Sequence, residues 1–458
     1  MIIWLWPPGV FPASIWSNAR SNAAITASRR RSNATRPMRW SGNFYQHGWI
    51  RRVIVLQLWR DLGRDTRWVL WSYFLWGVGE GLWIYMQPLY VRSLGASPAQ
   101  TGLVLGMWGV GRLLFILPAG ILADRYDARR LLIPGWYIGA LGVLIIALAP
   151  GWQWAALGFL IYGISAAAIP ITNLYLAQSA QHDPTRNPDL PLQRALTLLW
   201  AAYSLGLLVS PSIGGLISDA WGLRSVFLIS LFWFTVSMWT ILQTHSYPSP
   251  KRPALGYDYR GLLRQRSVVT AFGVTTLAFI VIYTGQTLAP QYLEEIHDYS
   301  RTWIGVLGSL NALGTAVLSL MLGRLSSWRG FFASLCLVML AFALLLWSGL
   351  WPVVVIGYFI LGAYNAARPF AVSLISERVS EHQRGMAYAL VDTLAGLAAV
   401  IGMNLAGRLY AVTPEWPFGV GIAGLIVVWG LGLALAHRPV QRNLAKQSTY
   451  GEVEPAGK

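Results

Sequence analysis

The sequence predicts an all-α membrane protein with twelve transmembrane helices in two related sets of six. Its composition is the first observation: 55% of the 458 residues are hydrophobic and 12% are charged, whereas a soluble domain carries about 25% charged residues. The second is that apolar runs of roughly 20 residues, each long enough to cross a bilayer, recur along the whole chain. The third is that glycine and proline spacings of the first half return in the second. An outer-membrane barrel would instead show short segments of alternating hydrophobicity.

The net charge of +17 comes from basic residues in short loops and chain ends. Anionic lipid and the positive-inside rule account for such residues, so we expect the lipid bilayer as the partner and no nucleic acid. One set of loops holds most of the arginines, which predicts a multi-pass protein of the inner (plasma) membrane with both termini in the cytoplasm. The single Cys336 cannot form an internal disulfide and leaves the redox compartment open.

Enzyme signatures are missing from the sequence. The six histidines fall in loops or tails without metal-binding spacing. The chain has no G-x-x-x-x-G-K-[ST] loop, which predicts that it does not itself hydrolyse ATP. We therefore expect no enzymatic activity, no catalytic residue, no metal and no cofactor, and energy drawn from an ion or solute gradient.

Residues 1–67 form a basic extension without the features of a signal peptide. Residues 18–39 are rich in Ser, Asn, Ala and Arg, which favours disorder, and residues 46–67 can form a basic amphipathic helix on the membrane surface. Met38 is an alternative start to Met1. We assign the extension no role in transport, and we expect residues 437–458 to be a disordered cytoplasmic tail.

The first six helices are expected within residues 68–243, at residues 68–91, 100–121, 131–149, 153–176, 194–217 and 225–242. Glu80 lies about twelve residues into the first helix and Arg112 about nine residues from the inner end of the second, which places them within about one turn in depth. An ionisable residue near the bilayer midplane is costly and is a candidate for function. The two are either a buried ion pair that fixes helix packing or residues of a proton-coupling cavity.

A charged turn separates the second and third helices and reads Gly-Ile-Leu-Ala-Asp-Arg-Tyr-Asp-Ala-Arg-Arg over residues 120–130. The glycine permits close helix packing, the arginines favour the cytoplasmic side, and a carboxylate is stabilised at a helix N-terminus. The turn resembles the signature G-x-L-A-D-R-x-G-x-R-R of the major facilitator superfamily of secondary transporters, with Asp127 in place of a glycine. The residues that carry the match, and that the resemblance implies control the conformational balance, are Gly120, Asp124, Arg125, Arg129 and Arg130.

The helix at residues 194–217 carries a second motif. It resembles the G-x-x-x-G-P-x-x-G-G motif of proton-coupled exporters of the same superfamily, through Gly206, Ser210, Pro211, Gly214 and Gly215, with Ser210 replacing a glycine. A proline bends the helix, and small residues permit tight contact between helices. The helix before it departs from the drug–proton antiporter pattern, because Phe159 stands before Gly163 where many such proteins have an arginine.

Residues 244–266 hold three prolines and a cluster of basic residues, and form a cytoplasmic linker between the halves. The halves repeat one another: glycines 102, 111 and 120 return at 305, 314 and 323, and the stretch 163–170 returns at 362–369. Such a repeat is typical of related transporter halves. Ser327 stands in the second copy where Asp124 stands in the first, so only the first half keeps the charged loop.

The second six helices are expected within residues 267–436, at residues 268–292, 303–325, 331–347, 352–375, 385–409 and 417–436. Arg368 and Asp392 each lie about seven residues from an inner helix end, so they share a depth and are expected to pair. The pair is either a structural or gating salt bridge or a place where Arg368 meets an anionic substrate. Further candidates for cavity lining are Trp83, Trp108, Asn173, Gln286, Asn311 and Asn365, although the tryptophans also suit packing against lipid.

The resemblance implies two six-helix bundles around a central cavity that is opened to either side by rocking of the bundles. With Glu80 as the protonation site, the expected function is proton-coupled efflux of hydrophobic or amphipathic small molecules by a monomer. One alternative is a proton symporter or uniporter for a sugar, organic anion or peptide, with Arg112 and Arg368 binding the anionic group. A second alternative is a membrane scaffold or receptor that does not transport.

Overall fold

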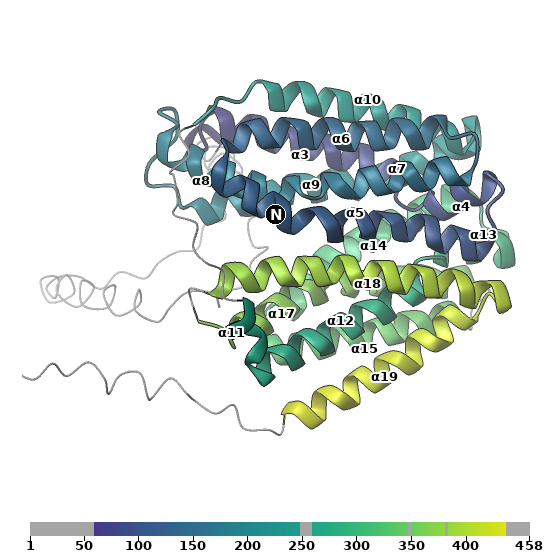
Figure 1. The fold of residues 1–458 in the computed structure, drawn as a ribbon. Helices are drawn as coiled ribbons and strands as arrows, with labels where there is room; N and C mark the ends of the chain where they lie inside the picture. Colours follow the sequence, from purple (N-terminus) through teal and green to yellow (C-terminus); the bar gives the residue numbers. More distant parts are fainter. Residues whose placement is uncertain (1–58, 248–258, 347–349, 381–382, 437–458) are drawn as a thin grey trace, which may run out of the picture.

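The computed structural model describes residues 59–247, 259–346, 350–380 and 383–436. Helices build two bundles that lie side by side (Figure 1). The first bundle contains α3 (Arg64–Trp83), α4 (Gln87–Ser93), α5 (Pro98–Arg125), α6 (Ala128–Leu148), α7 (Trp152–Ser165), α8 (Ala168–His182), α9 (Leu192–Trp221) and α10 (Leu223–Leu242). The second contains α11 (Tyr259–Arg264), α12 (Arg266–Gln286), α13 (Ala289–His297), α14 (Arg301–Leu322), α15 (Ser327–Leu346), α16 (Trp351–Leu361), α17 (Ala363–Ser376), α18 (Arg384–Val412) and α19 (Trp416–Ala436).

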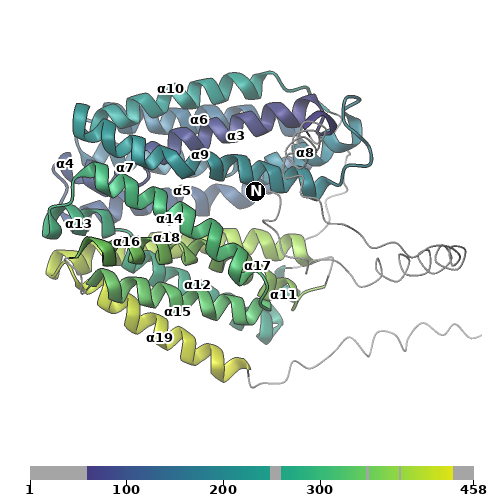
Figure 2. The ribbon, with the colours of Figure 1, turned by 180° about the vertical axis from the view of Figure 1, so that it is seen from behind.

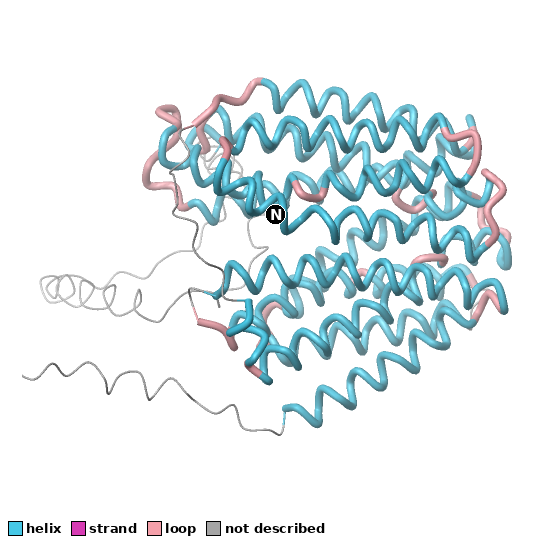
Figure 3. Tube along the Cα trace, viewed as in Figure 1, coloured by secondary structure: helices cyan, strands magenta, loops and turns pink. Residues whose placement is uncertain are grey.

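The loops gather at the two ends of the bundles (Figure 3). We call the end at which α3 begins and α10 ends the linker end, and the end that holds α4 and α13 the far end; Figure 2 shows both from behind. Among the described residues, eleven helical segments are long and apolar enough to cross a membrane. The remaining predicted span, at residues 68–91, corresponds to α3 and α4, which lie in the same bundle and pack on α9 and α10. The all-α fold of two bundles predicted from sequence is thereby confirmed.

Four predicted spans are broken in two. The spans at residues 68–91, 153–176 and 268–292 break about four residues before Pro88, Pro170 and Pro290 respectively. A proline ring clashes with the carbonyl four residues earlier and has no N–H to donate, which explains the position of these breaks. The fourth break, between α16 and α17, falls at Gly362, where a neighbouring helix crosses closely.

The internal repeat is visible as two equivalent helix crossings. In the first bundle a Cβ on Gly111 would lie 2.2 Å from the carbonyl oxygen of Leu160, and one on Gly163 would lie 2.2 Å from that of Trp108. In the second bundle a Cβ on Gly314 would lie 1.9 Å from the carbonyl oxygen of Phe359. Any larger side chain would separate these backbones, so the repeated glycines mark the same crossing in both bundles.

The bundles contact each other from the far end to about the middle of α5, where Gly109 faces Gly396. There α5 crosses α18 at Gly102 and Gly407, and α9 crosses α14 at Gly215 and Gly305. Hydrogen bonds join the same surfaces, including those from Tyr85 to Asn311 (3.0 Å), from Ser212 to Ser309 (2.7 Å) and from Thr302 to Asp219 (2.7 Å). Towards the linker end a Cβ on Gly120 would meet nothing within 4 Å. This conformation is therefore sealed at the far end.

Most of the N-terminal extension and the tail at 437–458 lie outside the described residues, as does the greater part of the predicted surface helix at 46–67. Residues 59–67 of that helix are described. Leu62 and Asp65 are buried against the first bundle, and α3 begins at Arg64, four residues before the predicted start. Burial of an apolar side chain and of a hydrogen-bonded carboxylate stabilises the contact of this segment with the first bundle.

Candidate functional site

Glu80 lies on α3 between α9 and α10, and glycines on both sides of it allow these helices to approach. A Cβ on Gly79 would lie 2.7 Å from the Phe234 ring, and one on Gly81 would lie 1.9 Å from Ser210 Oγ. The Tyr203 hydroxyl donates a hydrogen bond of 2.7 Å to Glu80 Oε2. The carboxylate is thus held by a neutral donor inside the bundle, and none of the ion pairs found among the described residues includes it.

Aromatic side chains surround Glu80, and we call Trp76, Tyr162, Tyr203 and Phe234 the aromatic niche. Trp76 stacks on Phe234 with ring centroids 4.1 Å apart, and its indole N–H donates to the Tyr162 hydroxyl at 3.3 Å. Phe234 and Tyr162 are buried, whereas Trp76 and Tyr203 are partly exposed. These two rings are the ones that a flat apolar molecule or a cation could reach.

Three charged residues meet between the bundles, and we call them the ion triad. Arg112 Nη2 on α5 donates to Asp392 Oδ1 on α18 at 2.9 Å, and Arg368 on α17 donates to the same oxygen. The side chain of Arg112 is 5% exposed, Asp392 is 31% exposed and Arg368 is 45% exposed. The Arg112 guanidinium also lies over the Trp108 ring, 5.5 Å from its centroid. One arginine is therefore deeply buried, and the other faces a more open space.

The structure confirms the predicted pair of Arg368 with Asp392 and corrects the predicted partnership of Glu80 with Arg112. Arg112 bonds to the second bundle, while Glu80 bonds to Tyr203 of its own bundle. The reason is the direction of each side chain: α5 packs its Gly109 face on Gly396 of α18, which turns Arg112 towards Asp392. Depth alone did not give this direction.

The charged turn after α5 holds the next helix and the chain after α10. Asp127 caps α6 by accepting a hydrogen bond of 3.0 Å from Arg129 N, and its other oxygen accepts one from the Ser246 hydroxyl. Arg129 Nη2 donates to the Leu242 carbonyl at 3.2 Å. Arg130 Nε lies 4.0 Å from Asp127 Oδ2. Asp127, which departs from the family pattern, thus has a role here as a helix cap; the side chains of Asp124 and Arg125 lie outside the described part.

The motif on α9 forms contacts with both bundles. Gly206 and Gly214 pack against α3, where a Cβ would lie 2.5 Å from Phe74 O and 1.8 Å from Leu82 O respectively. Gly215 and Pro211 face α14 of the second bundle. Ser210 Oγ, in the place of a glycine, donates to the Gly206 carbonyl at 2.7 Å and so keeps its polar atom paired inside the helix.

Comparison with known proteins now decides the family. The model of the Major Facilitator Superfamily matches residues 69–331 and 271–453. The chain belongs to this superfamily. It is 23% identical over 394 residues to Multidrug resistance protein 2 of Bacillus subtilis (strain 168), covering 82% of this chain and 96% of that protein. It is 21% identical over 377 residues to Quinolone resistance protein NorA of Staphylococcus aureus, covering 78% and 93%. Among solved structures, the nucleoside transporter NupG has the same fold, with a TM-score of 0.67, 15% identity and coverage of 81% of this chain and 98% of that one.

The cavity-lining residues predicted for this superfamily transporter divide into three groups. Trp83 is 1% exposed and is buried in the core, where its ring contacts those of Phe159, Tyr162 and Phe227. Asn311 is also buried and is a bridge between bundles, since it accepts from Tyr85 and donates to Tyr358 O at 3.0 Å. The partly or fully exposed members are Trp108, Asn173, Gln286 and Asn365.

Sequence reasoning missed the tyrosines that hold Glu80 and the acid that begins α3. Tyr203 and Tyr162 lie on α9 and α7, far from Glu80 in the sequence, and tyrosine is common in membrane helices for other reasons. Asp65 lay just before the predicted first helix and was included in the extension. A carboxylate is stabilised at a helix N-terminus, so the acid just before this glycine-rich span could have been used to predict that the helix begins earlier.

Proposed function

We propose that the chain is a proton-coupled exporter of hydrophobic or amphipathic small molecules, and that it works as a monomer in the inner (plasma) membrane. The resistance proteins among its relatives support efflux as the direction of transport. The positive-inside rule supports a cytoplasmic linker end, with both termini on that side. On this orientation, the seal at the far end corresponds to an inward-facing state.

The observation that carries the proposal is Glu80 within the aromatic niche. A carboxylate is costly to bury in an apolar bundle, and the neutral acid is less so. The Tyr203 hydroxyl can donate to the carboxylate, or accept from the acid, so the site is suited to hold and release a proton. Protonation therefore favours a closed niche, and a bound amphipathic molecule or water favours the ionised form. This difference between states links proton movement to bundle movement.

Replacing Glu80 by glutamine is expected to abolish gradient-driven transport, because the amide cannot release a proton. Ethidium would be added outside everted membrane vesicles as the probe, and its uptake measured with and without a proton gradient. Glu415→Gln, a change of the same chemistry in the far-end loop, is expected to transport like the parent protein.

Tyr203→Phe is expected to shift the pH dependence of uptake, because it removes the hydroxyl that bonds to Glu80.

Two outcomes would contradict the proposal. Ethidium uptake that survives collapse of the gradient in the parent protein would exclude proton coupling, and a gradient response kept by Glu80→Gln would exclude this residue. Counterflow of a labelled organic anion in place of ethidium would instead favour the alternative in which Arg112 and Arg368 bind the solute.

A further inference from the structure

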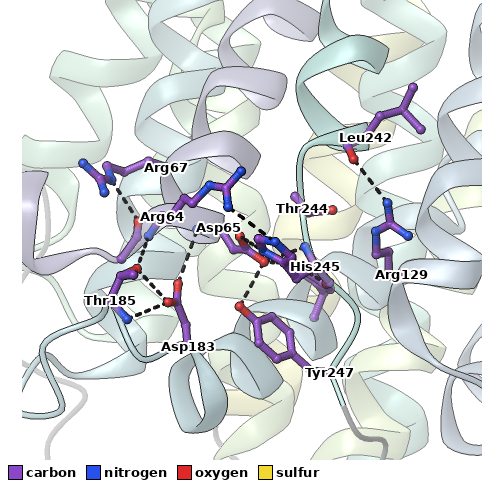
Figure 4. A network of polar contacts seen from close by, with 12 residues as sticks. Arg64, Asp65, Arg67, Arg129, Asp183, Thr185, Leu242, Thr244, His245 and Tyr247 are labelled. Carbon is purple, nitrogen blue, oxygen red and sulfur yellow. Dashed lines mark hydrogen bonds and ion pairs between the residues drawn. The ribbon is translucent and has the colours of Figure 1, made fainter.

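A buried carboxylate at the linker end joins three separate parts of the first bundle. Asp65, in the first turn of α3, is 1% exposed. Its Oδ2 accepts hydrogen bonds from the Tyr175 hydroxyl (2.7 Å), the Tyr247 hydroxyl (2.9 Å) and His245 N (2.7 Å). Its Oδ1 lies 3.0 Å from His245 Nδ1. We call these four residues the Asp65 clasp; Figure 4 shows His245 and Tyr247 converging on the carboxylate.

The donors in the clasp are fixed by their own neighbours. Arg64 Nη1 lies 3.4 Å from His245 Nε2, and a guanidinium can only donate, so this geometry assigns the ring proton of His245 to Nδ1, facing Asp65. Burial and the Asp65 carboxylate beside it raise the pKa of Tyr247 well above its ordinary value, so its hydroxyl keeps its proton. Each described group that bonds to the Asp65 oxygens is therefore a donor.

The same turn of α3 is held from its other side by the loop between α8 and α9. Gly63, at φ +77°, brings the backbone so close that a Cβ would lie 2.7 Å from Asp183 Oδ2. Arg64 N donates to Thr185 Oγ1 at 2.7 Å and Asp65 N donates to Asp183 Oδ2 at 3.3 Å. Glycine has no side chain to cap a helix, so the loop supplies the caps for the first N–H groups. The start of α3 is therefore held by contacts on both sides.

His245 and Tyr247 are the third and fifth residues after α10, which ends at Leu242, and they lie at the beginning of the linker between the bundles. Ser246, between them, donates a hydrogen bond to Asp127, and Arg129 donates one to the Leu242 carbonyl. The charged turn after α5 therefore also binds the chain that follows α10. At the other end of the linker, α11 is docked on the second bundle through Leu262, which is buried with Val268 and Ile375. Each end of the linker thus belongs to one bundle.

We propose that Asp65 is a positioning residue for transport, which fixes the start of the linker to the helix that carries Glu80. The inference rests on the alternating access of the proposed function. With the start fixed, the chain between residue 247 and α11 is all that joins the anchored points of the two bundles. The first bundle, with Glu80, then moves as a single body together with residues 244–247.

Asp65→Asn tests the clasp, because an amide of the same size must turn its NH2 group towards one or more of the donors. Spin labels would be placed at Ser246→Cys and Gln193→Cys in a Cys336→Ser background, both on the linker end of the first bundle. The bond from Ser246 to Asp127 is then absent from every protein compared, so the difference between them reports on the Asp65 clasp. We expect one narrow distance distribution with Asp65 and a broad or displaced one with Asp65→Asn. Asp189→Asn, an exposed acid in the α8–α9 loop, is the matched control and is expected to leave the distribution narrow.

Transport provides the second readout. We expect Asp65→Asn to lower ethidium turnover by about two- to tenfold, in the range seen for residues that act through an intervening element, with little change in the half-saturating concentration. If Asp65→Asn does not fold, Tyr247→Phe and His245→Ala remove donors from the linker side alone and are expected to broaden the distances in the same direction. A narrow distribution in all of these variants would overturn the proposal. The distance measurement needs neither substrate nor gradient, so it can fail or succeed independently of proton coupling at Glu80.

Discussion

Gly215→Val is expected to leave the protein folded but unable to seal its far end. A Cβ on Gly215 would lie 2.4 Å from Arg301 O and 2.9 Å from Thr302 Cα, both on the second bundle. The clash arises only while the bundles are packed together at this point, so it penalises one conformation and spares the other. Overpacking costs about 1–3 kcal/mol, and a difference of that size between two states changes their ratio by about 5- to 150-fold. We expect the outward-facing state to become dominant and ethidium transport to fall accordingly.

The adjacent residue provides the control for this prediction. A Cβ on Gly214 would lie 1.8 Å from Leu82 O within the first bundle, so Gly214→Val should reduce the yield of folded protein in every conformation. Folded yield would be measured by size-exclusion chromatography, and the conformation by thiol labelling from either side of the membrane. If the two variants behaved alike, the division of the α9 motif between the bundles would be refuted.

The repeat extends the same prediction to the other crossing. A Cβ on Gly102 would lie 2.3 Å from Met403 O of the second bundle, and Gly102 of α5 corresponds to Gly305 of α14, which itself faces Pro211. The spacing of these glycines was evident from the sequence. Their division into residues that pack within a bundle and residues that seal the two bundles was not, because both kinds share one spacing.

The sequence predicted where along each helix the charges lie, and the structure had to supply which neighbour each one faces. Rise per residue gives the depth of Glu80 and Arg112, but their directions depend on how α3 and α5 are packed by distant glycines. Arg368 and Asp392 were paired correctly, since they lie on α17 and α18 of the same bundle. Arg112 joins them from the other bundle, and such a contact exists only once the two bundles meet.

The positions of the helix breaks could have been predicted from the prolines in the sequence. Pro88, Pro170 and Pro290 each lie about four residues after a break, yet continuous apolar composition around them favoured a single span. The Asp65 clasp is the opposite case. Its members are spread from α3 to the linker, and each is an ordinary residue on its own, so only the fold reveals that they bind one another.

Asp392→Asn is expected to destabilise the sealed conformation strongly, because it leaves Arg112 buried beside a second arginine. Removing one partner of a buried ion pair costs about 3–5 kcal/mol, and the 31% exposure of Asp392 brings the expected loss below that range. The neutral amide can still accept a hydrogen bond, but it cannot offset the charge of Arg112. Thermal unfolding in detergent at low ionic strength would measure the loss, and thiol labelling would show whether the bundles separate.

The two arginines of the triad should respond differently to this change. Arg112→Gln in the Asp392→Asn protein removes the buried charge and is expected to restore most of the lost stability, because the triad then contains no uncompensated buried ion. Arg368→Gln in the same protein should restore little, since the Arg368 side chain is 45% exposed and can be hydrated. Equal rescue by both would mean that burial does not distinguish the arginines. Rescue by neither would mean that Asp392 acts through packing of α18 on α5, and that the ion triad does not hold the bundles together.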